Sequence, residues 1–309
     1  MRIVVSEFMD EAAVETLRER FDVLHDADLV DDRAALLASL RDADALIVRN
    51  RTQVDAGLLQ AAPRLRAVGR LGVGLDNIDT AACDARSVAV FPATGANAVA
   101  VAEYVICSAM MLLRGFWTVT PAVAAGAWPR TALSSGREIS GRTLGLLGFG
   151  GIGQTVAERA RALGMQVVAT DPALSSELPL WRERGVKPLA LEQMLAAADV
   201  VSLHVPLTSQ TRNLIDAVRI ASMKPRAVLI NTSRGGIIDE AALAAALRDG
   251  SLGGAAVDVF DQEPLPGGSP LADAPNLLLT PHVAGLTFES NQRVSSMVAD
   301  RVARFLTVA

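Results

Sequence analysis

The sequence predicts an α/β protein built on mostly parallel sheets, because short apolar runs alternate with helical patterns over nearly the whole chain. The first series of strand candidates is IVVS, DALIVR, AVGRLG and VAVFPA, with helices expected at 10–20 and 54–61. After a long helical stretch near 97–114, a second series follows: TLGLLGFG, QVVATD, VVSLHV, AVLINTS, AAVDVF and NLLLT. The second series has the rhythm of a Rossmann sheet.

Length and composition indicate a globular protein of about two domains. The chain has 309 residues, half of them hydrophobic, and a domain usually takes roughly 100 to 200 residues. The net charge of -5 and the lack of a Lys/Arg-rich run argue against a nucleic-acid or membrane-surface partner. Cys83 and Cys107 lie in apolar helical stretches, which favours buried free thiols in a reducing, cytoplasmic compartment over disulfides or a metal site.

Two further segments bear on location and packing. Met1 leads directly into a strand-like run with no basic region before it, so no signal peptide is expected. The apolar stretch 98–113 contains Glu103 and is too short for a membrane span, so we expect a buried helix. Near the end of the chain an apolar stripe at helical spacing needs a surface to cover. Its members are Val294, Met297, Val298, Val302 and Phe305.

The stretch GFGGIG places Gly148, Gly150 and Gly153 in the spacing G-x-G-x-x-G directly after a strand candidate. In a dinucleotide site these glycines permit the turn, the approach of the pyrophosphate and close helix packing, and the helix N-terminus faces the phosphates. Such turns also arise for steric reasons alone. Asp171 ends the next strand, 18 positions after Gly153. It is suited to bind the ribose hydroxyls and to repel a 2'-phosphate, although an Asp before Pro172 also suits a turn. Together the two features favour NAD over NADP.

Three side chains that could take part in catalysis follow later strands of the same series. They are Arg234 in NTSRGGIID, Glu263 in DVFDQEPLP and His282 in LLLTPHVAG. Loops at the carboxyl ends of parallel strands carry the ligands of such sheets. Each residue alone could be an ordinary surface or core residue, but their joint occurrence beside a nucleotide fingerprint indicates an active site.

These motifs together resemble the D-isomer-specific 2-hydroxyacid dehydrogenase family, in particular its phosphoglycerate dehydrogenase-like branch. The resemblance extends over GLLGFGGIGQ, TDP, VSLHVPLTSQTRNLI, INTSRGGIIDEAAL, AVDVFDQEPLP and TPHVAG, and upstream over GRLGVGLDNID and GANAVAVAEYV. One departure is Gly151, where many relatives carry a longer, often basic residue.

The resemblance implies a Rossmann doubly wound parallel sheet inserted into a discontinuous flavodoxin-like substrate domain. Residues 1–96 and 287–309 would form the substrate domain, and 97–286 the NAD-binding domain. The C-terminal helix would return to the first domain, and the substrate would lie in a cleft that closes around the reacting atoms.

By the same resemblance the catalytic residues would be Arg234, Glu263 and His282. Arg234 would bind the substrate carboxylate and polarise the keto oxygen, His282 would exchange a proton with that oxygen, and Glu263 would orient His282 and keep it protonated. The cofactor would be NAD, no metal is expected, and Asp258 would receive the nicotinamide carboxamide. The cofactor-binding set is Gly148, Gly150, Gly151, Ile152, Gly153, Asp171, His204, Val205, Pro206, Thr211, Thr232, Ser233, Asp258, His282 and Gly285. His25 is interpreted as a surface position.

The substrate is expected to be a small D-2-hydroxy acid with an anionic group on C3. Arg49 and Arg51 follow a strand of the first domain and Arg70 lies beside GVG, so guanidinium groups could receive a phosphate or sulfonate, although surface arginines would give the same pattern. The candidates are 3-phosphoglycerate and (S)-sulfolactate, since SEFMDEAAV to RNRTQVD resembles sulfolactate dehydrogenases, and (S)-sulfolactate has the spatial arrangement of D-lactate. The substrate-binding set is Arg49, Arg51, Val73, Gly74, Asn97 and Arg234.

Other functions remain open at this point. A hydroxypyruvate or glyoxylate reductase shares the chemistry, and a non-enzymatic NAD-binding scaffold or a structural oligomer shares the fold. A formate dehydrogenase is disfavoured because that branch carries Gln at the position of Glu263. A homodimer is expected.

Overall fold

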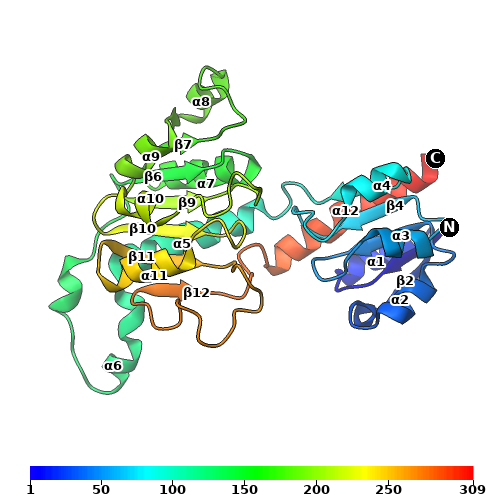
Figure 1. Cartoon of the computed structure of the whole chain (residues 1–309), viewed down its shortest axis with the longest axis horizontal. Helices are drawn as coiled ribbons and strands as arrows, with labels where there is room; N and C mark the ends of the chain where they lie inside the picture. The colour runs from blue at the N-terminus through cyan, green and yellow to red at the C-terminus, as the bar shows by residue number, and fades with distance from the viewer. Residues whose placement is uncertain (309) are drawn as a thin grey trace. The chain divides into compact units, whose positions relative to one another are not determined.

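The computed structural model describes residues 1–308 as two compact units (Figure 1). Unit 1 comprises Met1–Asn97 together with the chain from Leu286 onward, and unit 2 comprises Ala98–Gly285. These bounds differ by one residue at each joint from the expected domain boundaries. Every strand pair in both units is parallel, so the predicted α/β class with parallel sheets is confirmed.

Unit 1 contains a five-stranded sheet in the order β2-β1-β3-β4-β5, which is the flavodoxin-like order. Its strands are β1 (Arg2–Val5), β2 (Asp22–His25), β3 (Ala45–Val48), β4 (Ala67–Arg70) and β5 (Ala89–Pro92). Its helices are α1 (Glu11–Arg18), η1 (Ala27–Val30), α2 (Arg33–Ser39), α3 (Ala56–Ala61), α4 (Thr80–Ala85) and α12 (Phe288–Val308).

The two faces of the unit 1 sheet bury alternate residues of each strand. Ile3 and Val5 of β1 pack into one hydrophobic cluster, whereas Val4 packs into the other, as the two-residue period of a strand requires. The first cluster also contains Val298 and Val302 of α12. The apolar stripe of the last helix is therefore covered by the sheet formed from the first part of the chain.

Unit 2 contains a seven-stranded sheet in the order β12-β11-β10-β9-β6-β7-β8. Its strands are β6 (Thr143–Leu147), β7 (Gln166–Thr170), β8 (Lys187–Pro188), β9 (Val200–Leu203), β10 (Ala227–Asn231), β11 (Leu252–Val257) and β12 (Leu277–Leu279). Its helices are α5 (Ala98–Arg114), η2 (Phe116–Val119), α6 (Thr120–Ala124), η3 (Ala132–Ser135), α7 (Gly151–Ala162), α8 (Pro179–Arg184), α9 (Leu191–Ala197), α10 (Ala217–Ala221) and α11 (Glu240–Arg248). The chain winds outward from β6 in both directions, so the doubly wound Rossmann order is confirmed, with its switch point between β6 and β9.

Aspartate side chains begin several of these helices. Asp55 accepts a hydrogen bond from the N–H of Leu58 at α3, and Asp239 accepts from Ala241 and Ala242 at α11. Each such cap satisfies N–H groups that the helix itself leaves unpaired. The aspartates thus mark where the loops end and the helices begin.

Several sequence-based expectations were incomplete or wrong. The edge strands β2 and β8 were missed because they are short and little buried. Cys83 is buried as expected, but Cys107 is exposed, because it lies on the outer side of α5. His25 is not a surface position: only 14% of its side chain is exposed, and Nδ1 lies 3.7 Å from Glu11 Oε2.

Within residues 1–308 no single helix is both long and apolar enough to span a membrane, and only the pair Ala98–Arg114 and Phe116–Ala124, bent by 67°, reaches the required length and composition together.

Candidate active site

The first and third glycines of the fingerprint are fixed by close backbone contacts. Gly148 follows β6 with a φ of +97°, and a β-carbon there would lie 2.5 Å from the carbonyl oxygen of His204. A β-carbon on Gly153 would lie 2.4 Å from the carbonyl oxygen of Gly148. A larger residue at Gly148 would push this turn away from the loop after β9, and a larger residue at Gly153 would open the turn itself.

The second glycine, by contrast, faces open space at the start of α7. A β-carbon on Gly150 or Gly151 would meet nothing within 4 Å. Gly150 is the N-cap and provides no side-chain cap, so the first N–H groups of this helix are left for another acceptor. An open N-terminus of this kind fits the pyrophosphate of a dinucleotide.

Asp171 follows β7 and is held against the same turn. Its Oδ2 accepts from the N–H of Phe149 at 2.8 Å, and its Oδ1 accepts from the N–H of Ala173 at 2.9 Å. Because a carboxylate oxygen can accept about two hydrogen bonds, each oxygen keeps capacity for a ribose hydroxyl.

His204 begins the loop after β9, on the other side of the switch point. Its N–H donates to the carbonyl of Leu147 at 2.7 Å, and its ring Nε2 lies 3.0 Å from Ser202 Oγ. Burial lowers the pKa of His204 to about 4, so the ring is neutral near pH 7. The loop continues into a turn that Thr211 closes by donating to the carbonyl of Pro206 at 2.7 Å.

The segment after β10 is organised by its own hydrogen bonds. Asn231 Oδ1 accepts from the N–H of Ser233 at 3.0 Å, and Asn231 Nδ2 donates to the carbonyl of Arg234 at 2.9 Å. The hydroxyl of Thr232 is buried without a hydrogen-bond partner among residues 1–308. Because such an orphan is costly, it supports a bound group at this position.

Asp258 lies just after β11, is 1% exposed, and receives three donors. Its Oδ1 accepts from Thr280 Oγ1 at 2.5 Å and from the N–H of Val283 at 2.8 Å, and its Oδ2 accepts from the N–H of Ala284 at 2.8 Å. Its carbonyl accepts from the N–H of His282 at 2.8 Å. The loop after β12 is thus fastened to the end of β11.

His282 and Glu263 form the chemically most suggestive pair of unit 2. His282 Nδ1 lies 2.8 Å from Glu263 Oε2, while Glu263 Oε1 accepts from the N–H of Phe260 at 3.0 Å. The two side chains are 41% and 36% exposed. His282 has a φ of +56°, a conformation that side chains other than glycine rarely adopt and that is found preferentially at functional sites.

The predicted residues of unit 2 therefore share one region. They follow β6, β7, β9, β10, β11 and β12, and because these strands are parallel their carboxyl ends lie at one edge of the sheet. Gly285 ends this loop and is half-buried.

Val73, Gly74 and Asn97 belong to unit 1. Val73 and Gly74 are half-buried in the loop after β4. The Oδ1 atom of Asn97 is buried and has no hydrogen-bond partner within the described chain, which leaves an acceptor at that position.

Arg49 and Arg51 lie in the loop after β3, and they differ in environment. Arg49 Nη2 donates to Asn291 Oδ1 at 2.5 Å, and burial lowers the pKa of Arg49, partly offset by the charge of Glu7. Arg51 is exposed and forms a two-pronged ion pair with Asp31. Arg49 is thus the better placed of the two to bind an anion.

Glu7 organises this loop and was missed by the sequence analysis. Its buried carboxylate accepts from the N–H groups of Arg49 (2.8 Å), Asn50 (3.3 Å), Arg51 (3.2 Å) and Thr52 (3.0 Å). From the sequence alone, Glu7 in SEFMD would be expected to lie in solvent, because it stands just before a helix. Only the tertiary pairing of β1 with β3 brings it under the loop.

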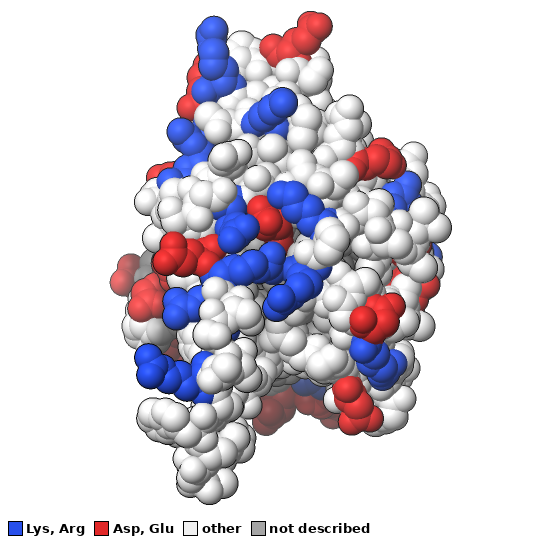
Figure 2. All heavy atoms as spheres, turned by 90° about the vertical axis from the view of Figure 1, so that its left-hand side faces the viewer, with Lys and Arg blue, Asp and Glu red and all other residues white. Residues whose placement is uncertain are grey.

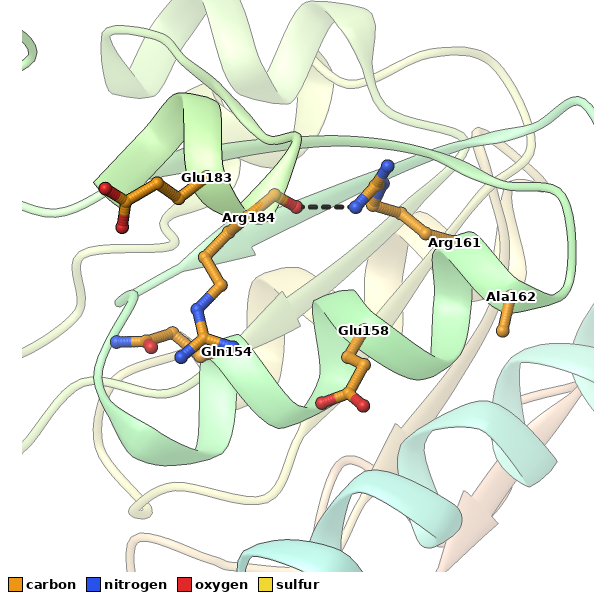
Figure 3. A pocket seen from close by; sticks show the side chains of 6 residues that line it. All are labelled: Gln154, Glu158, Arg161, Ala162, Glu183 and Arg184. Carbon is orange, nitrogen blue, oxygen red and sulfur yellow. Dashed lines mark hydrogen bonds between the residues drawn. The ribbon is translucent and has the colours of Figure 1, made fainter. Parts of the chain in front are cut away.

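Two surface features of unit 2 lie apart from these residues. Figure 3 shows a pocket of about 420 Å³ between α7 and α8, lined by both acidic and basic side chains, where Arg161 Nη1 donates to the carbonyl of Arg184 at 2.8 Å. On the side shown in Figure 2, basic side chains gather although the sequence has no basic run. Elsewhere in unit 2, Asp199 pairs with Lys224 at 3.2 Å and with Arg142 at 3.9 Å. In residues 1–308 no cluster of three His, Cys, Asp or Glu is arranged to hold a metal ion.

Comparison with known proteins identifies the class. The chain belongs to the D-isomer specific 2-hydroxyacid dehydrogenase family, whose NAD binding domain matches residues 106–284. It is 56% identical over 308 residues to an (S)-sulfolactate dehydrogenase of Chromohalobacter salexigens, covering 99% of this chain and 98% of that one.

Two other comparisons support the same class. The identity to the D-3-phosphoglycerate dehydrogenase of Mycobacterium tuberculosis is 41% over 271 residues, covering 88% of this chain but 51% of that longer protein. Among solved structures, the TT0316 protein of Thermus thermophilus aligns with a TM-score of 0.89 at 35% identity, covering 100% of this chain and 97% of that one.

The environment of His204 predicts a loss of stability in acid. The pKa of about 4 in the folded protein lies below the value of about 6.5 for a free side chain, so the unfolded state binds the proton first as the pH falls. Stability is then present above pH 6.5 and is lost progressively toward pH 4. Between pH 7 and pH 5 the wild type should lose about 2 kcal/mol more of its unfolding free energy than His204→Gln. Urea unfolding at both pH values measures this, and equal losses in the two proteins would contradict it.

Proposed function

We propose that this chain is an NAD-dependent dehydrogenase that interconverts a small D-2-hydroxy acid and its 2-keto acid. The observation that carries the proposal is the 2.8 Å contact between His282 Nδ1 and Glu263 Oε2. A carboxylate at Nδ1 keeps the proton on that nitrogen and leaves Nε2 for proton exchange with the substrate.

The three catalytic residues divide the work of the reaction. In reduction, His282 donates its Nε2 proton to the keto oxygen as hydride arrives at C2, and in oxidation it takes that proton back. Arg234 binds the substrate carboxylate and polarises the keto oxygen. Glu263 orients the imidazole through its contact with Nδ1. NAD(H), when bound, accepts or supplies the hydride.

The cofactor is assigned to the edge of the unit 2 sheet. We assign the pyrophosphate to the N–H groups at Gly150–Gly153, which include Gly151 and Ile152, and the adenosine to Asp171 and the loop of His204, Val205, Pro206 and Thr211. Thr232, Ser233, Gly285 and Asp258 would hold the nicotinamide end. Asp258 has three donors on its side chain, so about one acceptor site on Oδ2 remains for a carboxamide N–H. Asp171 favours NAD over NADP because its charge repels a 2'-phosphate.

For the substrate we favour (S)-sulfolactate, with D-3-phosphoglycerate as the second candidate. The preference rests on the identity of 56% to a sulfolactate dehydrogenase over nearly the full length of both chains, which includes unit 1. Backbone at Val73 and Gly74, with Asn97, would bind the carboxylate, and Arg49 would bind the sulfonate, because a partly desolvated guanidinium suits an anion that offers two oxygens.

The compartment is proposed to be reducing, as in the cytoplasm. Both Cys83 and Cys107 are unpaired, and an exposed thiol such as that of Cys107 persists most readily where thiols are kept reduced.

Replacing His282 should remove the chemistry and leave the cofactor site. His282→Ala is expected to lower kcat about 100- to 10,000-fold, with NADH affinity by fluorescence titration within about 2-fold of wild type. His25→Ala is the matched control, since His25 also lies beside a glutamate, Glu11, but belongs to unit 1. Full activity of His282→Ala would overturn the assignment.

The anionic tail is tested by a substrate panel. We expect kcat/KM for (S)-sulfolactate to exceed that for D-glycerate and D-lactate, and Arg49→Ala to lower it about 10- to 100-fold while changing D-lactate little. Arg33→Ala is the control, because Arg33 pairs with Asp55 in the same unit. Equal turnover of tailed and untailed acids, or a preference for glyoxylate or hydroxypyruvate in the reverse direction, would leave only the general dehydrogenase assignment.

A homodimer is proposed through the segment that follows α5. Three large apolar side chains there are exposed: Phe116 (49%), Val123 (42%) and Trp128 (80%). In Figure 1 this segment, with α6, projects away from the rest of unit 2, and a second copy of the chain is a self-complementary cover for it. Sedimentation should give a dimer for the wild type and for Val218→Glu, whose side chain is exposed elsewhere (76%), but a monomer for Trp128→Glu. A monomeric wild type at micromolar concentration would exclude this interface.

A further inference from the structure

A chain of hydrogen bonds runs from α5 to the loop that carries His282. The phenol oxygen of Tyr104 lies 2.6 Å from Thr280 Oγ1, and Thr280 Oγ1 lies 2.5 Å from Asp258 Oδ1. Tyr104 projects from α5, Thr280 follows β12 and Asp258 follows β11. Three separate elements of unit 2 therefore meet through three polar side chains, of which Asp258 is buried and the other two are half-buried.

The direction of these hydrogen bonds follows from the chemistry of the groups. An ionised carboxylate only accepts, so Thr280 must donate its single hydroxyl proton to Asp258. The Thr280 oxygen is then free only to accept, and Tyr104 must be its donor. Burial, with the charge of Asp258 among the lesser causes, raises the pKa of Tyr104, so its proton is retained over the working pH range.

The far end of this chain is the backbone around His282. Asp258 accepts from the N–H groups of Val283 and Ala284, both at 2.8 Å, and its carbonyl accepts from the N–H of His282 at 2.8 Å. These contacts hold His282 at its positive φ of +56°. Only Asp258 therefore lies between Thr280 and the backbone of His282, and a change in the hydrogen bond between Thr280 and Asp258 would shift the histidine.

We propose that Tyr104 is a positioning residue for the dehydrogenase reaction, acting through Thr280 and Asp258 on the placement of His282. The inference rests on the proposed function of His282. The hydrogen bonds described here lead from Tyr104 to the loop of His282 by way of Thr280 and Asp258. The hydroxyl of Tyr104 fixes the rotamer in which Thr280 donates its hydrogen bond to Asp258. Without that donor the threonine hydroxyl is free to turn to other acceptors.

A packing role alone would look different. The ring of Tyr104 lies against the hydrophobic cluster beneath α5, so removal of the whole side chain would disturb the helix. Tyr104→Phe removes only the hydroxyl and keeps the ring, so it separates positioning from packing.

The test is a double-mutant cycle on Tyr104 and Thr280. Tyr104→Phe should lower kcat about 3- to 10-fold, the effect of one ordinary hydrogen bond, with KM for the keto acid within about 2-fold. Thr280→Val should lower kcat at least as much. The double variant should be no worse than Thr280→Val, because Tyr104 has no route to Asp258 once the hydroxyl of Thr280 is gone.

Two further variants complete the design. Thr280→Ser keeps the hydroxyl and should restore kcat to within about 2-fold of wild type. Thr16→Val removes an exposed hydroxyl of unit 1 that donates to the carbonyl of Ala12 at 2.9 Å, and it should be fully active. Thermal unfolding of each variant confirms that rates are compared between folded proteins.

The outcomes separate this inference from the proposed function. If His282→Ala is inactive and Tyr104→Phe keeps the wild-type kcat, the positioning role is wrong and the catalytic assignment stands. The positioning role is also wrong if the losses in kcat of the two single variants add in the double variant. It is equally wrong if Tyr104→Phe raises KM and leaves kcat unchanged. If His282→Ala keeps the wild-type activity, the proposed function is wrong, and the positioning role that depends on it is wrong as well.

Discussion

The site of unit 2 depends on one buried carboxylate, Asp258. Burying a charge is costly unless donors replace the lost water, and three donors do so from a side-chain hydroxyl and two consecutive peptide groups. Two of those donors belong to the backbone next to His282. The requirement to satisfy this charge therefore dictates the path of the loop after β12, and with it the position of the imidazole.

The histidine is held from two sides, and the two constraints differ in kind. Asp258 fixes the backbone, whereas Glu263 fixes the ring by its contact with Nδ1. Glu263 is in turn fixed by the N–H of Phe260. A proton-exchanging group needs orientation more than mobility, since misplacement by about 1 Å can cost a factor of about 100 in rate. The unfavourable backbone conformation of His282 persists because both constraints agree on it.

How far sequence reasoning reaches depends on whether a feature is local. The glycine turn and the strand-end positions of Arg234, Glu263 and His282 were predictable, because the sequence spacing and the alternation of strands and helices fix them. Both sheet orders followed only from the resemblance to the family. Glu7, Tyr104 and the pairing of Arg51 with Asp31 were not, because each partner comes from a distant element. The exposure of Cys107 was misjudged for a related reason: α5 is apolar on most sides, and only the fold shows which side lacks a covering layer. The strands β2 and β8 were missed because edge strands are short and carry a weak apolar pattern.

The interrupted core of unit 1 has a consequence during synthesis on the ribosome. Unit 2 is continuous in sequence, so all of it leaves the ribosome before the last helix does. Unit 1 is different, because Ile3 and Val5 share a cluster with Val298 and Val302, and that cluster stays incomplete while nearly 200 intervening residues are translated. For that time one apolar face of its sheet is exposed in the nascent chain, a state that invites aggregation. The first segment to be translated is thus the one whose core is completed only by the last segment.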